Sequence, residues 1–442
     1  MKVGTFIPNT KEEQLEMLRE IGYKDFDDLF GHVPEKAKFK GALDIPKGKP
    51  EAEVFDIMKE MSEKNRIFKK IFRGAGAYNH YVPAAVDAIS GKEEFLTAYT
   101  PYQAEISQGI LQSIFEFQTM ICELTGMDVA NASMYDGASA AAEGCAMTAD
   151  RKRSTIYVSE TTDPRVLSVI KTYSFGRDTE VKCVPEKDGE TDKEALAKML
   201  GEDPEAACFL FSYPNFYGIV EDADAIAKTV HDAGAQLVMY FDPIALGILK
   251  TPGEIGADVA VGEGQSLGMG LSFGGPYLGL LTTTQKNMRK IVGRVVGETV
   301  DTNGERGYVL TLQAREQHIR REKAASNICT SQALCALRAG VYMATVGPAG
   351  IEKLALSCSS NAHYLADGLA KAGLKLRYDK PFFNEFVTDS AKENELLAAL
   401  EKKDILGGLP LKDGGILWCA TEMNSKEDIG EVVAAVKEVI GA

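Results

Sequence analysis

The sequence is poor in positive charge for its length. Its 442 residues include 49 Lys and Arg against 64 Asp and Glu, a formal net charge of −15. Nucleic acids and anionic membranes repel such a chain at long range, so neither is an expected partner. The composition, 45% hydrophobic and 26% charged, is that of a globular protein. The length predicts two or three domains.

Several other signatures are missing. Residues 1–10 lack the features of a secretory signal, and no apolar run approaches the ~20 residues that cross a bilayer. The eight cysteines show no disulfide or zinc pattern, and the five histidines show no metal-ligand spacing. GxSxG and GxxxxGK motifs are also absent. We therefore expect a cytoplasmic protein with reduced thiols and no metal site.

Hydrophobic patterning divides the chain into three predicted regions. Residues 1–103 predict helical and extended segments that wrap a surface. Residues 104–325 alternate helices with β-rich runs, which indicates a mainly parallel sheet covered on both faces. Residues 326–442 predict a smaller α+β domain, which opens with an apolar helix over 328–346 that breaks at Gly347-Pro348. The predicted strands are 155–158, 181–184, 208–212, 237–241, 259–261, 277–281, 383–387 and 415–419.

An aromatic segment, residues 72–103, is predicted as a loop that leads into an amphipathic helix over 105–124. The apolar face of this helix consists of Ile106, Ile110, Ile114, Phe117, Ile121 and Leu124. Such a face beside aromatic side chains is typical of a subunit interface. The aromatic rings, hydroxyls and amides could wall a small-molecule site or fill an interface core. The candidate substrate or interface residues are Tyr78, His80, Tyr99, Thr100, Tyr102 and Gln103.

The most informative absence is that of lysine. No lysine lies between Lys250 and Lys286, where the chain builds the far end of its predicted sheet. Pyridoxal phosphate enzymes hold their cofactor as a Schiff base on a lysine, with an acid under the pyridine nitrogen and a helix N-terminus on the phosphate. The glycine-rich turn in this stretch offers Gln265 and Ser266, and neither has an amine. The Schiff base is excluded at this place.

The other two parts of such a site do have candidates. Asp242 follows the apolar run 237–241, at a strand end where open α/β sheets bind ligands, and the loop 134–140 enters an alanine-rich helix. Each has a plainer interpretation, because Asp before Pro forms loops and Asp136 is a good N-cap that competes with phosphate. We interpret the chain as a cofactor-free relative of a pyridoxal enzyme. Its predicted remnant pocket consists of Asp136, Gly137, Ser139, Asp242, Gln265 and Ser266.

Four motifs resemble those of one known family. They are Phe72-Arg73-Gly74-Ala75-Gly76-Ala77-Tyr78, Thr97-Ala98-Tyr99-Thr100-Pro101-Tyr102-Gln103-Ala104-Glu105, Asn131-Ala132-Ser133-Met134-Tyr135-Asp136-Gly137 and Arg321-Glu322-Lys323-Ala324-Ala325-Ser326-Asn327-Ile328-Cys329-Thr330. Together they are similar to the signatures of subunit 1, the α chain, of the glycine dehydrogenase (decarboxylating) P-protein. The similarity runs from Phe6-Ile7-Pro8-Asn9 to Cys419-Ala420-Thr421-Glu422-Met423-Asn424.

This resemblance implies a fold type I pyridoxal phosphate-dependent transferase-like architecture, with a large α/β domain and a smaller C-terminal α+β domain. It implies that the catalytic lysine and pyridoxal 5'-phosphate belong to subunit 2, the β chain, in an α2β2 assembly. The His-Lys pair of that chain falls on Gln265 and Ser266. The implied reaction, of the oxidoreductase class, decarboxylates glycine and passes the aminomethyl group to the lipoyl group of H-protein. No catalytic residue is then expected in this chain.

Two other functions remain open from the sequence. One is a self-sufficient pyridoxal phosphate enzyme, such as an aminotransferase, that uses a lysine outside the expected stretch. The other is a scaffold or regulatory subunit outside the active site. Aldimine absorption by the chain alone would support the first of these, and unchanged turnover after removal of the aromatic loop side chains would support the second.

Overall fold

The computed structural model describes residues 9–98 and 101–441, which form two compact units that meet in sequence between Ile67 and Phe68. The first unit contains α1 (Lys11–Glu20), α2 (Phe26–Leu29), η1 (Glu35–Ala37) and α3 (Glu51–Ser62). A reciprocal capping box between Thr10 and Glu13 begins α1. Among residues 9–67 only Leu18 is buried, so the described part of this unit has almost no core of its own.

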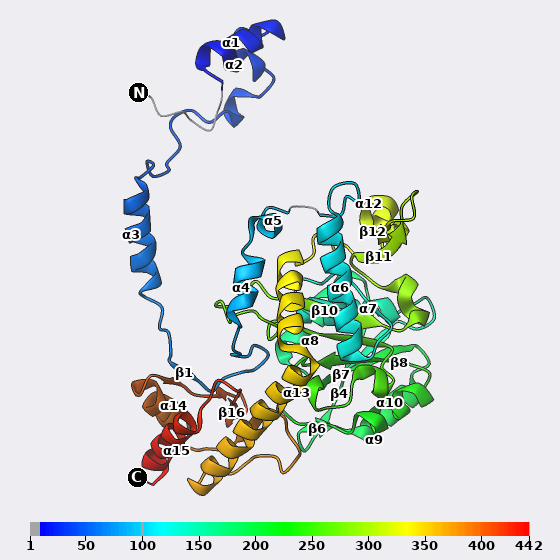
Figure 1. Cartoon of the computed structure of the whole chain (residues 1–442), viewed down its shortest axis with the longest axis vertical. Coiled ribbons are helices and arrows are strands. Elements are labelled where there is room, and N and C mark those ends of the chain that lie inside the picture. The colour runs from blue at the N-terminus through cyan, green and yellow to red at the C-terminus, as the bar shows by residue number, and fades with distance from the viewer. Residues whose placement is uncertain (1–8, 99–100, 442) are drawn as a thin grey trace. The chain divides into compact units, whose positions relative to one another are not determined.

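A seven-stranded sheet forms the centre of the second unit (Figure 1). Its strands are β2 (Val129–Ala130), β3 (Thr155–Ser159), β4 (Val181–Val184), β7 (Ala206–Tyr213), β8 (Gln236–Phe241), β9 (Val259–Glu263) and β10 (Gly279–Thr283). In the order β2-β10-β9-β8-β7-β3-β4, only β10 runs antiparallel to its neighbours. The predicted, mainly parallel sheet is thus confirmed.

Helices cover both faces of this sheet, because its strands alternate buried side chains between two cores. Val158 and Leu210 pack with α7 (Gly137–Thr148) and α8 (Pro164–Gly176) on one face. Phe209 and Leu237 pack with α9 (Lys193–Glu202) and α10 (Ala223–Asp232) on the other. All eight residues of β7 are buried, as a central strand requires.

The amphipathic helix predicted over 105–124 is α6 (Gln108–Thr125), which Gly126 ends in the left-handed conformation. Its apolar face lies largely inside the second unit, since Ile114, Phe117 and Ile121 are buried. The expectation that this face forms an exposed subunit interface is therefore wrong for most of its length. Ile106, which precedes the helix, is 79% exposed.

The long helix α13 (Ala333–Lys371) starts beside α6 and ends beside α15 (Lys426–Ile440), as Figure 1 shows. Gly347, with φ of 67°, kinks it where the sequence predicts a break, but the helix continues beyond Pro348. By length and composition alone this helix could cross a membrane, although its apolar run is interrupted at Gly347-Pro348. Its buried residues Ala339, Leu365 and Leu369 belong to two protein cores, and core helices pass the same test.

A second, three-stranded antiparallel sheet lies near the C-terminus, with the order β13 (Glu385–Thr388), β16 (Ile416–Cys419), β15 (Leu409–Pro410). It packs with α14 (Glu393–Lys402), α15 and the end of α13 around buried Trp418. The chain just after the first unit joins this layer, because β1 (Lys70–Ile71) pairs with β14 (Ile405–Leu406) and Phe72 enters the same core. The predicted domain boundaries at 103 and 325 stay predictions.

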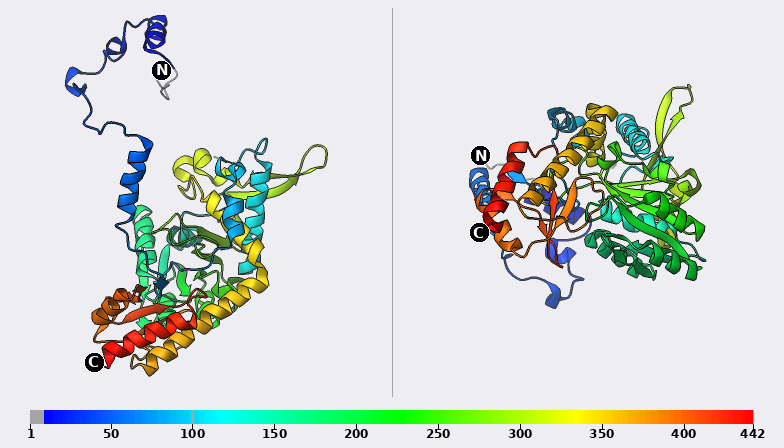
Figure 2. Two further views of the ribbon diagram at one scale, coloured as in Figure 1. Left: turned by 60° about the vertical axis from the view of Figure 1, so that its left-hand side comes forward. Right: turned by 90° about the horizontal axis from the view of Figure 1, so that it is seen from below.

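Some elements were not predicted. The segment 72–103, expected as a loop, contains the helices α4 (Ala84–Ser90) and α5 (Glu93–Leu96). The hairpin of β11 (Val295–Val300) and β12 (Arg306–Thr311) projects from the second unit (Figure 2). The remaining short elements are β5 (Glu186–Lys187), β6 (Glu190–Thr191), η2 (Ala245–Gly247), α11 (Pro252–Ile255), η3 (Gln285–Lys290), η4 (Gln313–Arg315), α12 (Gln317–Arg320) and η5 (Arg321–Lys323).

Candidate functional site: the sheet end and the Tyr102 pocket

Asp242 lies where the sequence places it, directly after β8 at the end of the sheet. Its carboxylate accepts the main-chain N–H groups of Ile244 at 2.8 Å and Ala245 at 3.3 Å. Burial raises the pKa of Asp242, while nearby His80 and the two N–H groups act in the opposite direction. Asp242 lines a cavity of ≈ 50 Å³ together with Tyr240, Glu263 and side chains of distant segments.

Gln265 occupies the turn after β9 and binds a segment far away in sequence. Its Oε1 accepts the N–H of Tyr78 at 2.8 Å, and its Nε2 donates to the Tyr78 carbonyl at 3.0 Å and to that of Met269 at 2.8 Å. The adjacent Ser266 is buried, and its hydroxyl has no hydrogen-bond partner. Of the predicted pocket residues, only Asp242 lines the sheet-end cavity, while Gln265 holds the backbone of the Tyr78 segment.

Residues 75–81 are held from the opposite side by the C-terminal layer. Glu385 accepts the N–H of Ala75 at 2.6 Å and the hydroxyl of Tyr78 at 2.8 Å. Glu422 accepts the N–H of Tyr81 at 2.7 Å and lies 2.8 Å from Nδ1 of His80. We call residues 75–81 the clamped segment, because both the sheet end and the C-terminal layer bind it.

Three carboxylates, those of buried Glu385 and of partly buried Glu263 and Glu422, differ in their electrostatics. Burial raises the pKa of Glu263 to about 7, against the opposing effect of hydrogen bonds from main-chain N–H groups. Burial likewise raises the pKa of Glu385 to about 7. Burial acts in the same direction on Glu422, but hydrogen bonding to His80 and to the Tyr81 N–H outweighs it, so its pKa is lowered.

The entrance to α7 shows why the pocket disagrees with a phosphate-bearing cofactor. Asp136 caps the helix by accepting the Ser139 N–H at 2.7 Å, and Glu263 accepts the Gly137 N–H at 2.8 Å. These carboxylates use N–H groups that would otherwise be available to a phosphate. The ≈ 50 Å³ cavity is also far below the about 300–1,000 Å³ of small-molecule sites. With no lysine at Gln265 or Ser266, pyridoxal phosphate does not fit here.

Among the described residues, one group could hold a metal ion by geometry. One ligand atom each of His80, Cys358 and Glu422 lies within 4.8 Å of the others. Sequence spacing could not indicate this group, since its members come from three distant segments. Its contacts are hydrogen bonds to Glu422, at 2.8 Å from His80 and 3.4 Å from Cys358, and they account for the grouping without an ion. All eight cysteines are free.

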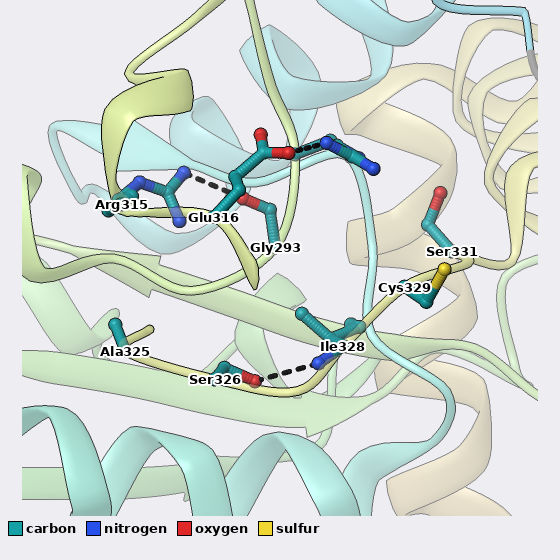
Figure 3. Close-up of a pocket in the computed structure, with 9 residues that line it drawn as sticks. Gly293, Arg315, Glu316, Ala325, Ser326, Ile328, Cys329 and Ser331 are labelled. Atoms are coloured by element: carbon teal, nitrogen blue, oxygen red, sulfur yellow. Dashed lines mark hydrogen bonds and ion pairs between the residues drawn. The ribbon is translucent and has the colours of Figure 1, made fainter. Parts of the chain in front are cut away.

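A second candidate region surrounds Tyr102. Its hydroxyl lies 2.5 Å from that of Ser331, and the guanidinium of Arg294 stands 5.3 Å from its ring centroid. Arg294 pairs with Glu316, while Arg315 donates to the Gly293 carbonyl at 2.6 Å (Figure 3). Burial is the main cause that lowers the pKa of Arg315 to about 10, and the positive charge of Arg294 is the second.

The structure thus separates the candidate substrate or interface residues into two groups. The side chains of Tyr78 and His80 are bound by Glu385 and Glu422 of the C-terminal layer, whereas Tyr102 contacts Ser331 and Arg294. Gln103 is exposed. Tyr99 and Thr100 lie outside the described residues.

Sequence reasoning missed several residues of both regions. Glu263 belongs to the glycine-rich stretch that drew attention to Gln265, and its position between Gly262 and Gly264 was the available signal. Glu385 and Glu422 lie in the C-terminal layer, more than 300 residues from their hydrogen-bond partners in the clamped segment, so no local pattern reveals them. Arg294 was missed as well, because its contact with Tyr102 joins two segments that are distant in sequence.

Comparisons with known proteins agree on one family. The family model of the glycine cleavage system P-protein matches residues 4–436. A probable glycine dehydrogenase (decarboxylating) subunit 1 of Desulfitobacterium hafniense is 45% identical, over 98% of this chain and 99% of the relative. The corresponding protein of Carboxydothermus hydrogenoformans is 46% identical, over 99% of both chains.

Solved structures support the same assignment. The crystal structure of a glycine decarboxylase (P-protein) of the glycine cleavage system, in inhibitor-bound form, aligns with a TM-score of 0.91 and 41% identity, over 99% of this chain and 100% of that one. A sphingosine-1-phosphate lyase of Burkholderia pseudomallei aligns with a TM-score of 0.66 at 13% identity, over 92% and 94% of the two chains, which shows the fold alone. The predicted fold type I architecture is confirmed.

Proposed function

This chain belongs to the glycine cleavage system P-protein family, and we propose that it is the subunit of the enzyme that does not carry the cofactor. With a second, lysine-bearing subunit it decarboxylates glycine and transfers the aminomethyl group to the lipoyl group of H-protein. The cofactor of that reaction, pyridoxal 5'-phosphate, belongs to the second subunit and supplies the electron sink for decarboxylation. The present chain contributes walls and positioning groups.

The observation that carries this proposal is the content of the sheet end. Gln265 and Ser266 stand where an amine is needed, and Gln265 is already engaged with the Tyr78 backbone. Glu263 and Asp136 occupy N–H groups at the start of α7. A chain of this kind requires a partner for the chemistry. The names of its relatives, subunit 1, also support a partner subunit.

We place the Tyr102 region toward the partner's active site. Tyr102, Gln103 and the adjoining Tyr99 and Thr100 supply rings, hydroxyls and an amide, which suit a small zwitterion or a lipoyl arm. Arg294 lies beside the Tyr102 ring and is paired with Glu316, so it holds the ring in place. Tyr78 and His80 stabilise the clamped segment within this chain and act on the site only through it.

The assembly is proposed as α2β2 in the cytoplasm, with glycine and lipoylated H-protein as further partners. The first unit favours extensive pairing, because its helices bury only Leu18 and expose large apolar side chains such as Phe55 and Met58. Such surfaces are normally covered by another chain.

Co-purification with the lysine-bearing subunit tests the proposal. Glycine-dependent release of CO2 should be absent from each subunit alone and present when they are combined, with lipoylated H-protein as acceptor. The absorption band of the aldimine should be present in samples that contain the second subunit and absent from this chain alone. Decarboxylation by this chain alone, or full activity of the second subunit alone, would show that the division of labour is different.

A further inference from the structure

Three main-chain N–H groups converge on the carboxylate of Glu263. Its Oε2 accepts the N–H of Gly137, the first residue of α7, at 2.8 Å. Its Oε1 accepts the N–H groups of Leu278 at 2.9 Å and Gln265 at 3.0 Å. The donors come from a helix start, the residue before β10 and the turn after β9. Convergent main-chain donors at a helix N-terminus are the structure that proteins use to bind oxyanions.

The surroundings of Glu263 do not favour a negative charge. Asp136 brings a second carboxylate to the same helix end, and the charge of Asp136 opposes ionisation of Glu263. Asp242 and Glu385 line the same cavity, and none of its described lining residues is a lysine or an arginine. Burial of a carboxylate is unfavourable in itself. The three N–H groups are therefore the features that favour the ionised form of Glu263, against the burial that raises its pKa to about 7.

The close packing around Gly137 fixes the geometry of these donors. A Cβ on Gly137 would stand 2.5 Å from the Tyr240 hydroxyl and 2.9 Å from Cβ of Glu263. Only glycine brings this N–H to the carboxylate without displacing β8 or β9. The donor set is thus built into the fold, and the Glu263 side chain occupies it.

We propose that the carboxyl group of Glu263 fills an oxyanion site of the phosphate class, and that removal of its side chain exposes a latent site for phosphate or a phosphate monoester. Glu263 takes the place of a ligand phosphate, and Asp242 lines the same cavity. This assignment does not depend on the proposed function, because a complex with its partner could turn over glycine whatever occupies this position.

Chemical rescue tests the assignment in the full chain. Thermal unfolding of Glu263→Ala is compared in sodium phosphate and in sodium chloride at equal pH and ionic strength. The variant should melt below the wild type in chloride, and inorganic phosphate should raise its midpoint saturably by about 5 °C, the effect of a ligand well above its Kd. The wild-type midpoint should respond much less, because Glu263 already fills the site.

The matched control is Glu221→Ala. Glu221 is also a buried carboxylate, but it accepts only one main-chain N–H, that of Thr191, and otherwise binds side chains. Its loss should destabilise the chain without selective rescue by phosphate. Equal shifts for both variants and the wild type reflect general salt stabilisation and would overturn the assignment, as would no shift in Glu263→Ala. If that variant does not fold in chloride, its refolding yield in phosphate against chloride decides in the same way.

Discussion

At the scale of single residues, side chains at the sheet end already use the main-chain groups that a cofactor would need there. Gln265 binds both main-chain groups of Tyr78, and Glu263 binds the start of α7. Neither interaction leaves room for the groups that a pyridoxal enzyme requires at these positions. A single substitution at Ser266 therefore restores only one of the missing parts.

We expect Ser266→Lys to remain inactive without the partner. The new amine would be introduced at a buried position, and N–H groups at the start of α7 that a phosphate would need are already bound to Glu263 and Asp136. Neither the variant nor the wild-type chain should form a borohydride-reducible adduct with pyridoxal phosphate at this position, as mass spectrometry of peptides would show. Release of CO2 from glycine by the isolated variant would contradict this expectation.

The raised pKa of Glu385 predicts a pH-dependent stability. Its folded pKa of about 7 lies above the ordinary value of 4.5. The contribution of Glu385 is thus complete below about pH 4.5 and is lost as the pH rises through 7, by up to about 3 kcal/mol. Glu385→Gln retains an acceptor for the Ala75 N–H and lacks the ionisation. The stability difference, variant minus wild type, should therefore increase between pH 5 and pH 8.

Urea unfolding at the two pH values measures this change, with the fluorescence of Trp418, the single tryptophan, as the probe. The comparison cancels the similar contribution of Glu263, which both proteins retain. A difference that does not vary with pH would show that Glu385 is not the titrating group.

The sequence predicted these residues unevenly. Asp242, Gln265 and Ser266 were identified because each directly follows a strand or glycine-rich turn, and such positions meet at one sheet edge. Glu385 and Glu422 were not, because their roles arise from contacts across more than 300 residues of sequence. Tyr78 and His80 were identified as candidates, but only the structure could show toward which side they turn.

At the scale of elements, the strands of the large sheet were the easiest to predict. Their apolar runs are short and are separated by helical periodicity, as parallel sheets require. The hairpin β11–β12 was missed although Asn303-Gly304, a strong turn signal, lies between its strands. The helix α4 was missed although Pro83 precedes it. In both cases a local turn or helix-start signal was present in the sequence, but the aromatic and charged residues around it did not suggest a strand or a helix.

The Tyr102 region provides a prediction at this scale. Tyr102→Phe removes the hydroxyl that lies 2.5 Å from Ser331 and preserves the ring beneath Arg294. If the region serves the active site, the complex should assemble normally but turn over glycine at least ~10-fold more slowly, equivalent to ~1.4 kcal/mol. Thr100→Ala should behave in the same way.

Tyr364→Phe is the matched control, because Tyr364 is half exposed on α13 and lies beside Lys426. It should leave turnover unchanged. Normal turnover by assembled Tyr102→Phe complexes would assign the Tyr102 hydroxyl to packing.

The helix α3 provides a second prediction about an element. Its residues Val54, Phe55, Met58 and Met61 are exposed, and the helix has no buried residue. Phe55→Ser combined with Met58→Ser should weaken association with the partner by at least ~10-fold, since interfaces depend on a few large apolar anchors. Lys59→Ser with Glu60→Ser is the control on the charged face. Sedimentation of the mixed subunits measures both, and equal association of the two double variants would rule out α3 as an anchor.

At the scale of the whole molecule, the first unit exposes half of the large apolar side chains that are exposed in the described chain. The sequence placed the interface instead on the apolar face of α6, which packs mostly inside the second unit. Both faces have the same periodicity, and only tertiary contacts decide which of them is covered.

Expressed without its partner, the chain should therefore self-associate or aggregate. Uncovered apolar side chains of the first unit are the physical cause, and an obligate interface of this type buries more than ~2,000 Å² in total. Light scattering at increasing concentration, with and without the second subunit, measures the effect. A dispersed, stable monomer would be strong grounds against obligate pairing.

The clamped segment has a mechanical consequence. Residues 75–81 are hydrogen-bonded on one side to the sheet end, through Gln265, and on the other to the C-terminal layer, through Glu385 and Glu422. The seven-stranded sheet and the C-terminal layer are thus connected by the clamped segment as well as by α13. Separating them would break buried hydrogen bonds on at least one side of this segment. We therefore expect the sheet and the C-terminal layer of this subunit to stay fixed relative to each other during turnover. Any opening and closing during turnover is then expected in the other subunit.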